Sequence, residues 1–164
     1  EALIEIRGRV ISSSLNIEHK LDDIISVLFM GNELEPINLF KELLLEKEFF
    51  TFMNKWKLLR ELTQREIIRF EKEEIRKETL NLVKNIIETR DRFAHGEIIF
   101  WGTTPQLIYL EGGKKKRFTL DNDYFDQQNV KFVQADDILR DIYNFFLNRN
   151  TQHQKKESSE QYCT

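Results

Sequence analysis

The chain has 164 residues, of which 40% are hydrophobic and 32% are charged, and it contains 13 Phe but only 6 Gly and 2 Pro. This composition is typical of a soluble, helix-rich protein, and the length suits one domain that buries roughly 70% of its unfolded surface. The net charge of −3 argues against a protein that coats nucleic acid through bulk positive charge, although it leaves room for a local basic cleft.

Two further features bear on where the protein works. The one cysteine, Cys163, cannot form an internal disulfide, which favours a reducing, cytoplasmic compartment. No apolar run approaches the roughly 18 residues of a membrane span, and the chain has no signal-peptide pattern, so we expect no membrane partner. The chain opens with Glu1 rather than Met, which is typical of a fragment or a processed protein.

The first half of the chain carries the period of buried helices. Apolar residues recur every three or four positions from about Leu3 to Phe29, which predicts a long helix that stops at Gly31-Asn32. Between Ile37 and Leu62 the pattern predicts a short helix and then a longer one, with a break near Glu48. The charged segment that follows, 63–74, fits either a loop or an exposed helix end.

The second half begins with the clearest helical stripe in the sequence, from about Glu74 to Thr89. Short strand-like runs follow at 98–101, 106–110 and 117–120, and the glycines and lysines of 112–116 fit a hairpin tip. A helical stripe returns over 134–148, and 150–164 reads as a disordered polar tail. The sequence therefore predicts a mainly α fold: one helical domain over 1–149, with a small β-hairpin insert at about 98–120 before the last helix.

The stretch Thr89-Arg90-Asp91-Arg92-Phe93-Ala94-His95-Gly96 joins these halves. Arg90 shares a helix face with the apolar Ile86 and Ile87, where an arginine is unusual unless it meets an anion or lines a groove. If the helix frays near Phe93 or Gly96, His95 lies on the turn beyond Arg90 and both side chains reach one groove. Helix capping or a salt bridge is the structural alternative for these residues.

Arginine and histidine together suit RNA cleavage through the RNA's own 2′-hydroxyl. A guanidinium binds phosphate in a planar fork, and an imidazole transfers protons near neutral pH. Such a reaction needs both an acid and a base, whereas the other histidines, His19 and His153, lie in the first helix and the tail. A symmetric dimer would supply two copies of the pair across one cleft.

The string Arg90-Asp91-Arg92-Phe93-Ala94-His95 resembles the R-x4-H signature of the HEPN superfamily, and the continuation Phe93-Ala94-His95-Gly96 is similar to many bacterial HEPN-like proteins. The resemblance implies a helical bundle that dimerises with the motif at a shared cleft. It further implies a metal-independent endoribonuclease of toxin–antitoxin, abortive-infection or other defence systems, with an antitoxin or regulatory protein as a further partner.

Carried over, Arg90 and His95 are the catalytic pair and Asp91 is the supporting polar residue. Two departures stand out: the strand-like insert is not part of the minimal HEPN bundle, and Glu97 replaces the tyrosine of the HEPN partners of minimal nucleotidyltransferases. Since some HEPN proteins are inactive, the alternative is a non-catalytic module that binds nucleic acid or a partner protein. A purely structural helical domain is the third reading.

Other charged residues are secondary candidates. Five basic residues are candidates for contact with RNA phosphates: Arg92, Lys114, Lys115, Lys116 and Arg117. A solvated hairpin tip is the simpler explanation of the last four. Glu18 lies among apolar positions of the first helix and is a candidate partner of Arg90. Neither a calcium loop nor a Cys/His zinc spacing is complete, so we expect no metal or other cofactor.

Overall fold

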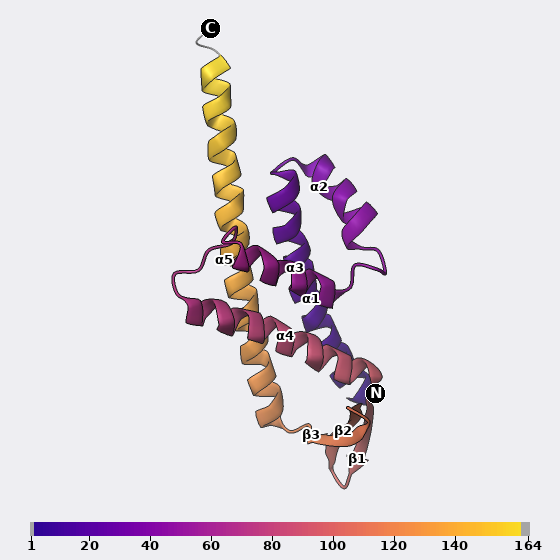
Figure 1. The fold of residues 1–164 in the computed structure, drawn as a ribbon. Helices are drawn as coiled ribbons and strands as arrows, with labels where there is room; N and C mark the ends of the chain where they lie inside the picture. Colours follow the sequence, from indigo (N-terminus) through magenta and orange to yellow (C-terminus); the bar gives the residue numbers. More distant parts are fainter. Residues whose placement is uncertain (1, 162–164) are drawn as a thin grey trace.

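The computed structural model describes residues 2–161, and side chains are described for residues 4–152. The fold is mainly α, as the sequence predicts, with a small antiparallel sheet before the last helix (Figure 1). In chain order the elements are α1 (Ala2–Met30), α2 (Leu34–Phe40), the π-helix η1 (Lys41–Leu45), α3 (Phe52–Gln64), α4 (Glu73–His95), β1 (Glu97–Trp101), β2 (Thr104–Glu111), β3 (Lys114–Thr119) and α5 (Asn122–Gln161).

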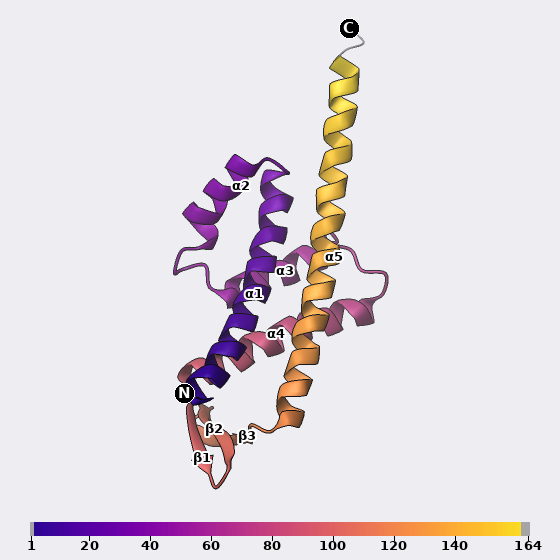
Figure 2. The same ribbon diagram turned by 180° about the vertical axis from the view of Figure 1, so that it is seen from behind.

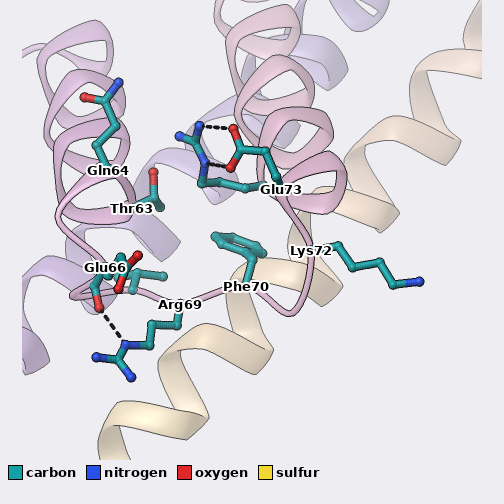
Figure 3. Close-up of a pocket in the computed structure, with 9 residues that line it drawn as sticks. Thr63, Gln64, Glu66, Arg69, Phe70, Lys72 and Glu73 are labelled. Atoms are coloured by element: carbon teal, nitrogen blue, oxygen red, sulfur yellow. Dashed lines mark hydrogen bonds and ion pairs between the residues drawn. The ribbon is translucent and has the colours of Figure 1, made fainter.

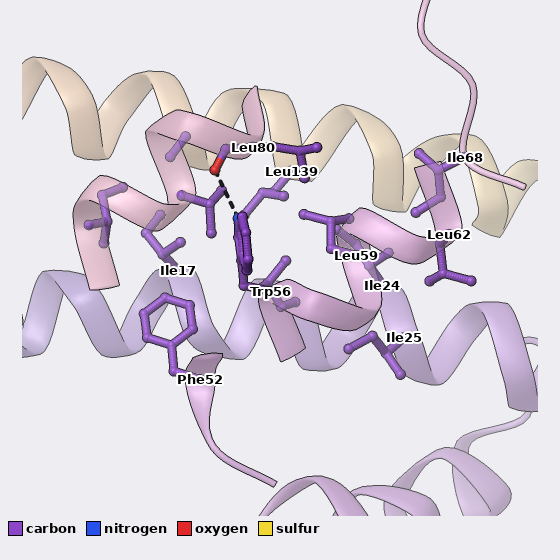
Figure 4. Packing of buried hydrophobic residues seen from close by; sticks show 14 of the residues in the cluster. Ile17, Ile24, Ile25, Phe52, Trp56, Leu59, Leu62, Ile68, Leu80 and Leu139 are labelled. Carbon is purple, nitrogen blue, oxygen red and sulfur yellow. Dashed lines mark hydrogen bonds between the residues drawn. The ribbon is translucent and has the colours of Figure 1, made fainter. Parts of the chain in front are cut away.

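Four helices form the bundle. The two long helices α1 and α5 rise in the same direction, and α3 and α4 cross them in both views (Figures 1 and 2). Their apolar faces meet in the main core, where the indole of Trp56 donates a hydrogen bond of 2.8 Å to the carbonyl oxygen of Leu80 (Figure 4). Within the described residues, no helix combines the length and apolarity that crossing a membrane requires.

The segment between α1 and α3 forms an arm beside this bundle. Gly31 takes a left-handed φ of +76° just beyond the end of α1, which a glycine tolerates without strain. α2 follows and lies beside the bundle (Figure 1). It buries none of its residues, and Leu34, Leu39 and Leu43 of this arm are exposed. The break predicted near Glu48 lies between η1 and α3.

The insert is a three-stranded antiparallel sheet in the order β1-β2-β3, so it contains two hairpins rather than the one predicted. The second turn is tighter than expected, because Gly112 and Gly113 alone form it, with φ of +58° and +75°. The lysines that the sequence suggested at the tip therefore lie in β3, where Lys114 pairs with Glu111 and Lys116 pairs with Tyr109.

α5 is much longer than the helix predicted over 134–148. It begins at Asn122, where the Asp121 carboxylate accepts a hydrogen bond of 2.9 Å from the backbone N–H of Tyr124. It continues to Gln161, beyond the boundary predicted at residue 149, because no Gly or Pro interrupts 122–161. The final part of the predicted tail, 162–164, lies outside the described residues.

Candidate functional site

The motif occupies the end of α4, where this helix meets the sheet. Ile86, Ile87 and Phe93 are buried, and Phe93 belongs to a second, smaller core between α1, α4, the sheet and the start of α5. Because α4 is helical through His95 and Gly96 is its C-cap, the motif lies on the final turns of a helix whose inner face is fixed by packing.

Gly96 is required by close packing. A Cβ atom here would meet the carbonyl oxygen of Arg92, would come within 2.7 Å of Leu107 Cδ1 and would come within 2.9 Å of the carbonyl oxygen of Ile108. The guanidinium of Arg7 donates a hydrogen bond of 2.7 Å to the carbonyl oxygen of Gly96 and so ties α1 to this junction. Close packing therefore explains why a glycine follows the histidine, without any role for this glycine in chemistry.

A shallow groove of about 740 Å³ runs between the last turns of α4 and strand β2. Asp91, Arg92 and His95 line its helical side, and Lys115 of β3 lines it from the sheet. Three acids complete the polar part of the lining: Glu88, Glu97 and Glu111. His95 is exposed in this groove, where its imidazole can meet a bound substrate.

Arg90 lies outside this groove. Five positions of a continuous α-helix turn the side chain by about 140°, so Arg90 and His95 point to different sides of α4. The guanidinium of Arg90 instead lies 3.4 Å from the Asp91 carboxylate, and its side chain is 35% exposed. The convergence expected from an early end of the helix does not occur within one chain, because the helix includes His95.

Arg92 is held by the protein itself. Its guanidinium carbon lies 5.3 Å from the centre of the Tyr109 ring and 5.7 Å from that of Phe118. The Nη2 atom of Arg92 lies 3.4 Å from the carboxylate of Glu111 and 3.7 Å from the carboxylate of Glu88. Through these contacts Arg92 of α4 binds the side chains of β2 and β3 and stabilises the packing of the sheet on α4.

The neighbouring Tyr124 is also affected by its surroundings. Its ring packs beside Phe118, and burial raises the pKa of Tyr124 to about 12.

The basic run of β3 divides between the two faces of the sheet, because alternate strand residues point to opposite sides. Lys115 reaches the groove that contains His95, whereas Lys116 lies on the other face, 4.0 Å from Glu111. The guanidinium of Arg117 lies over the ring of Trp101, 5.4 Å from its centre. Only part of the predicted set is therefore close to the groove.

Glu18 does not pair with Arg90. Its carboxylate lies 2.9 Å from the ammonium of Lys55, which also contacts the buried Asp22 at 2.9 Å. Burial raises the pKa of Asp22 to about 6, although the hydrogen bond from Lys55 opposes this shift. Sequence reasoning missed this cluster, although Lys55 falls at helical spacing between the apolar residues Phe52 and Leu59, which was the available signal.

A second hollow, of about 370 Å³, lies around the loop between α3 and α4 (Figure 3). Arg76 forms two hydrogen bonds to the carboxylate of Glu73, and Arg69 donates a hydrogen bond of 3.1 Å to the carbonyl oxygen of Glu66. Among the described residues, no group of His, Cys, Asp or Glu side chains is arranged to hold a metal ion.

Comparison of the chain with protein-family models, with curated proteins and with solved structures found no match. The resemblance to HEPN proteins therefore depends on the motif string in the sequence.

Proposed function

We propose that this chain is a HEPN-like, metal-independent endoribonuclease that acts as a homodimer, with His95 as its proton-transfer group, Arg90 as its phosphate ligand and Asp91 in support. The observation that carries the proposal is the exposure of His95 in a groove that Lys115 lines from the opposite side. Packing accounts for the neighbouring Phe93 and Gly96, but no described contact gives His95 a structural role.

The reaction follows from the chemistry of these groups. The imidazole of His95 removes the proton from a ribose 2′-hydroxyl, and the 2′-oxygen then attacks the adjacent phosphorus. The bond to the 5′-oxygen breaks, this oxygen takes a proton, and the products carry a 2′,3′-cyclic phosphate and a 5′-hydroxyl. A guanidinium stabilises the negative charge that builds on the phosphoryl oxygens.

A second copy of the chain completes this site in the proposal. One histidine cannot at once be the base for the 2′-hydroxyl and the acid for the leaving oxygen, so His95 of a second copy supplies the other role. The 140° or so between Arg90 and His95 on one helix also favours this arrangement, since Arg90 of one copy can then serve the groove of the other. Bacterial defence or toxin–antitoxin control is the setting that we propose.

The second candidate is a non-catalytic module that binds nucleic acid or a partner protein. The observation in its favour is that Arg90 pairs with Asp91 and does not line the groove that contains His95. A binding surface needs no convergence of these two side chains, whereas cleavage needs both at one phosphate.

Incubation of the purified protein with total RNA in EDTA tests the proposal. The wild type should cleave RNA and leave cyclic phosphate ends, and His95→Ala should lower the rate by roughly 10²–10⁴-fold. His19→Ala is the matched control, because it removes an exposed histidine from α1, away from the groove, and should leave the rate unchanged. Arg90→Ala should also lose cleavage.

The alternative outcomes separate the two candidates. Binding of RNA without cleavage, unaffected by His95→Ala, would overturn the nuclease and favour the binding module. Cleavage that survives His95→Ala would show that another site performs the chemistry. Sedimentation of the wild type with and without RNA tests the dimer, and a monomer in both conditions contradicts the shared cleft.

A further inference from the structure

The outer face of the sheet, which points away from the second core, continues the groove that contains His95. Ile98, Leu107 and Phe118 stand in one row and point to the core side, so the neighbouring positions on each strand point outward. Four residues of this outer face also line the groove: Glu97, Ile108, Leu110 and Lys115. A ligand in the groove at His95 can therefore also contact residues of the outer face.

An exposed aromatic ring lies on this same face. Trp101 ends β1 and is 67% exposed, which is unusual for the largest apolar side chain in a protein. The guanidinium of Arg117 lies 5.4 Å from the centre of its ring. The indole and the guanidinium are both planar groups on which a nucleobase can stack.

The row of residues between these two groups contains an unsatisfied polar atom. Gln106 stands between the row of Trp101 and the row of Arg117 in the strand register. The side-chain oxygen of Gln106 is buried and has no hydrogen-bond partner among the described residues. A buried acceptor without a partner is costly, and a movement of this covered side chain toward a donor on a bound base would relieve that cost.

The charge of the outer face is complementary to a nucleic acid backbone. Lys115 and Arg117 both project here from β3, and Glu97 is the one acid that the three described strands place on this side. The protein as a whole carries a net charge of −3, whereas these strand residues of the outer face carry two basic groups and one acid.

We propose that the outer face of the sheet binds single-stranded RNA by stacking an unpaired base on Trp101, with Arg117 and Lys115 at the flanking phosphates. This proposal rests on the proposed function, because it names the form of RNA that reaches His95. Bases in a duplex are stacked on one another and cannot lie against the indole, whereas those of a loop or single strand can. Trp101 then selects unpaired RNA, and its neighbours supply charge.

Fluorescence anisotropy with a labelled 2′-O-methyl oligoadenylate tests this, because the probe lacks the 2′-hydroxyl and resists cleavage. The Trp101→Ala variant should bind the probe about 5- to 150-fold less tightly than the wild type, because one base can no longer stack. The Trp101→Phe variant should recover part of this affinity. Phe100→Ala is the matched control, since it removes an exposed aromatic residue from the opposite face of the same strand and should bind as the wild type does. The duplex of the probe with its complement should bind less tightly than the single strand.

Salt dependence separates stacking from charge. Trp101→Ala should leave the slope of log affinity against log salt unchanged, whereas Lys115→Gln should reduce it by about 0.7. Wild-type binding that Trp101→Ala does not weaken would overturn the stacking proposal and leave the nuclease proposal intact. Loss of RNA cleavage in His95→Ala would support the nuclease proposal, and weakened probe binding by Trp101→Ala would support the stacking proposal. Absence of probe binding by the wild type would overturn this proposal, and the cleavage assay would still decide the proposed function separately.

Discussion

The molecule contains two charged clusters on the same helical scaffold, and their surroundings are opposite. In the bundle, the Lys55 side chain is 4% exposed and contacts the carboxylates of Glu18 and Asp22, so the charges are buried together. At the end of α4, the side chains of Arg90 and Asp91 are 35% and 51% exposed and form an ion pair of 3.4 Å. His95 is also exposed and lines an open groove.

This difference helps to separate structure from function. A buried ion pair is weak evidence for added stability, but removal of one partner leaves an uncompensated charge and is costly. An exposed pair contributes little to stability and leaves its groups free to meet a substrate. We therefore expect substitutions in the Lys55 cluster to change folding, and substitutions of Arg90, Asp91 and His95 to change RNA chemistry with little effect on folding.

The largest effect on stability is expected from Lys55→Ala. This substitution leaves two carboxylates without their cation in the bundle, and the free energy of unfolding at pH 7 should fall by about 3–5 kcal/mol. Lys57→Ala is the matched control: Lys57 is exposed on the same helix, and its loss should change stability by less than about 0.5 kcal/mol. Urea denaturation of both variants measures the difference.

His95→Ala completes this comparison: it should resemble Lys57→Ala in stability and, under the proposed function, lower the rate of RNA cleavage by roughly 10²–10⁴-fold. A large loss of stability in His95→Ala, or none in Lys55→Ala, would reverse the contrast between the two clusters.

The second prediction concerns pH and the buried cluster. Burial raises the pKa of Asp22 from 3.8 to about 6, so the folded protein holds a proton that the unfolded chain releases between these values. The contribution of Asp22 is therefore fully present below about pH 4 and is lost as the pH rises through 6. Relative to Asp22→Asn, the wild type should lose at most about 3 kcal/mol of stability between pH 4 and 7.

Denaturant titrations of the wild type and Asp22→Asn at several pH values measure this difference, in which the other titrating groups largely cancel. A wild type that gains stability relative to Asp22→Asn over that pH range would show that the pairing with Lys55 outweighs burial.

Much of the fold could be predicted because the spacing of apolar residues and the residues that end helices or form turns are local signals in the sequence. The stripe of α1, the stop at Gly31 and the three strands of the insert are all visible as spacing or turn residues. The sequence did not predict the start of α5, because Asp121 and the polar residues after it are typical of a loop. In the structure Asp121 caps this helix, and its first turns pack against the sheet. Tertiary contact, rather than propensity, decides that boundary.

The site was harder to predict than the fold, because partners depend on tertiary contacts. The motif string marks Arg90 and His95, but only the uninterrupted helix shows that they point to different sides of α4. The partner of Glu18 was mistaken for the same reason, since Lys55 is 37 residues away in the sequence and adjacent in space. Trp101 carries no signal of exposure in a strand-like run of apolar residues.

The smallest of these effects is expected from Gly96→Ala, which tests how much of the motif is structural. An added Cβ would meet the backbone of Arg92 and Ile108 where α4 packs on β2, and such overpacking costs about 1–3 kcal/mol. Gly8→Ala provides the contrast, because a Cβ there meets nothing within 4 Å in the interior of α1, and alanine should raise stability by up to about 1 kcal/mol.

The two glycine substitutions, measured by thermal denaturation, should therefore differ in sign. If Gly96→Ala folds with wild-type stability but loses RNA cleavage, the glycine serves the chemistry of His95 directly rather than the packing of the junction. If the variant loses stability and RNA cleavage to the same degree, Gly96 is a structural residue, like those of the Lys55 cluster. The residues of the motif that serve the proposed chemistry are then Arg90, Asp91 and His95.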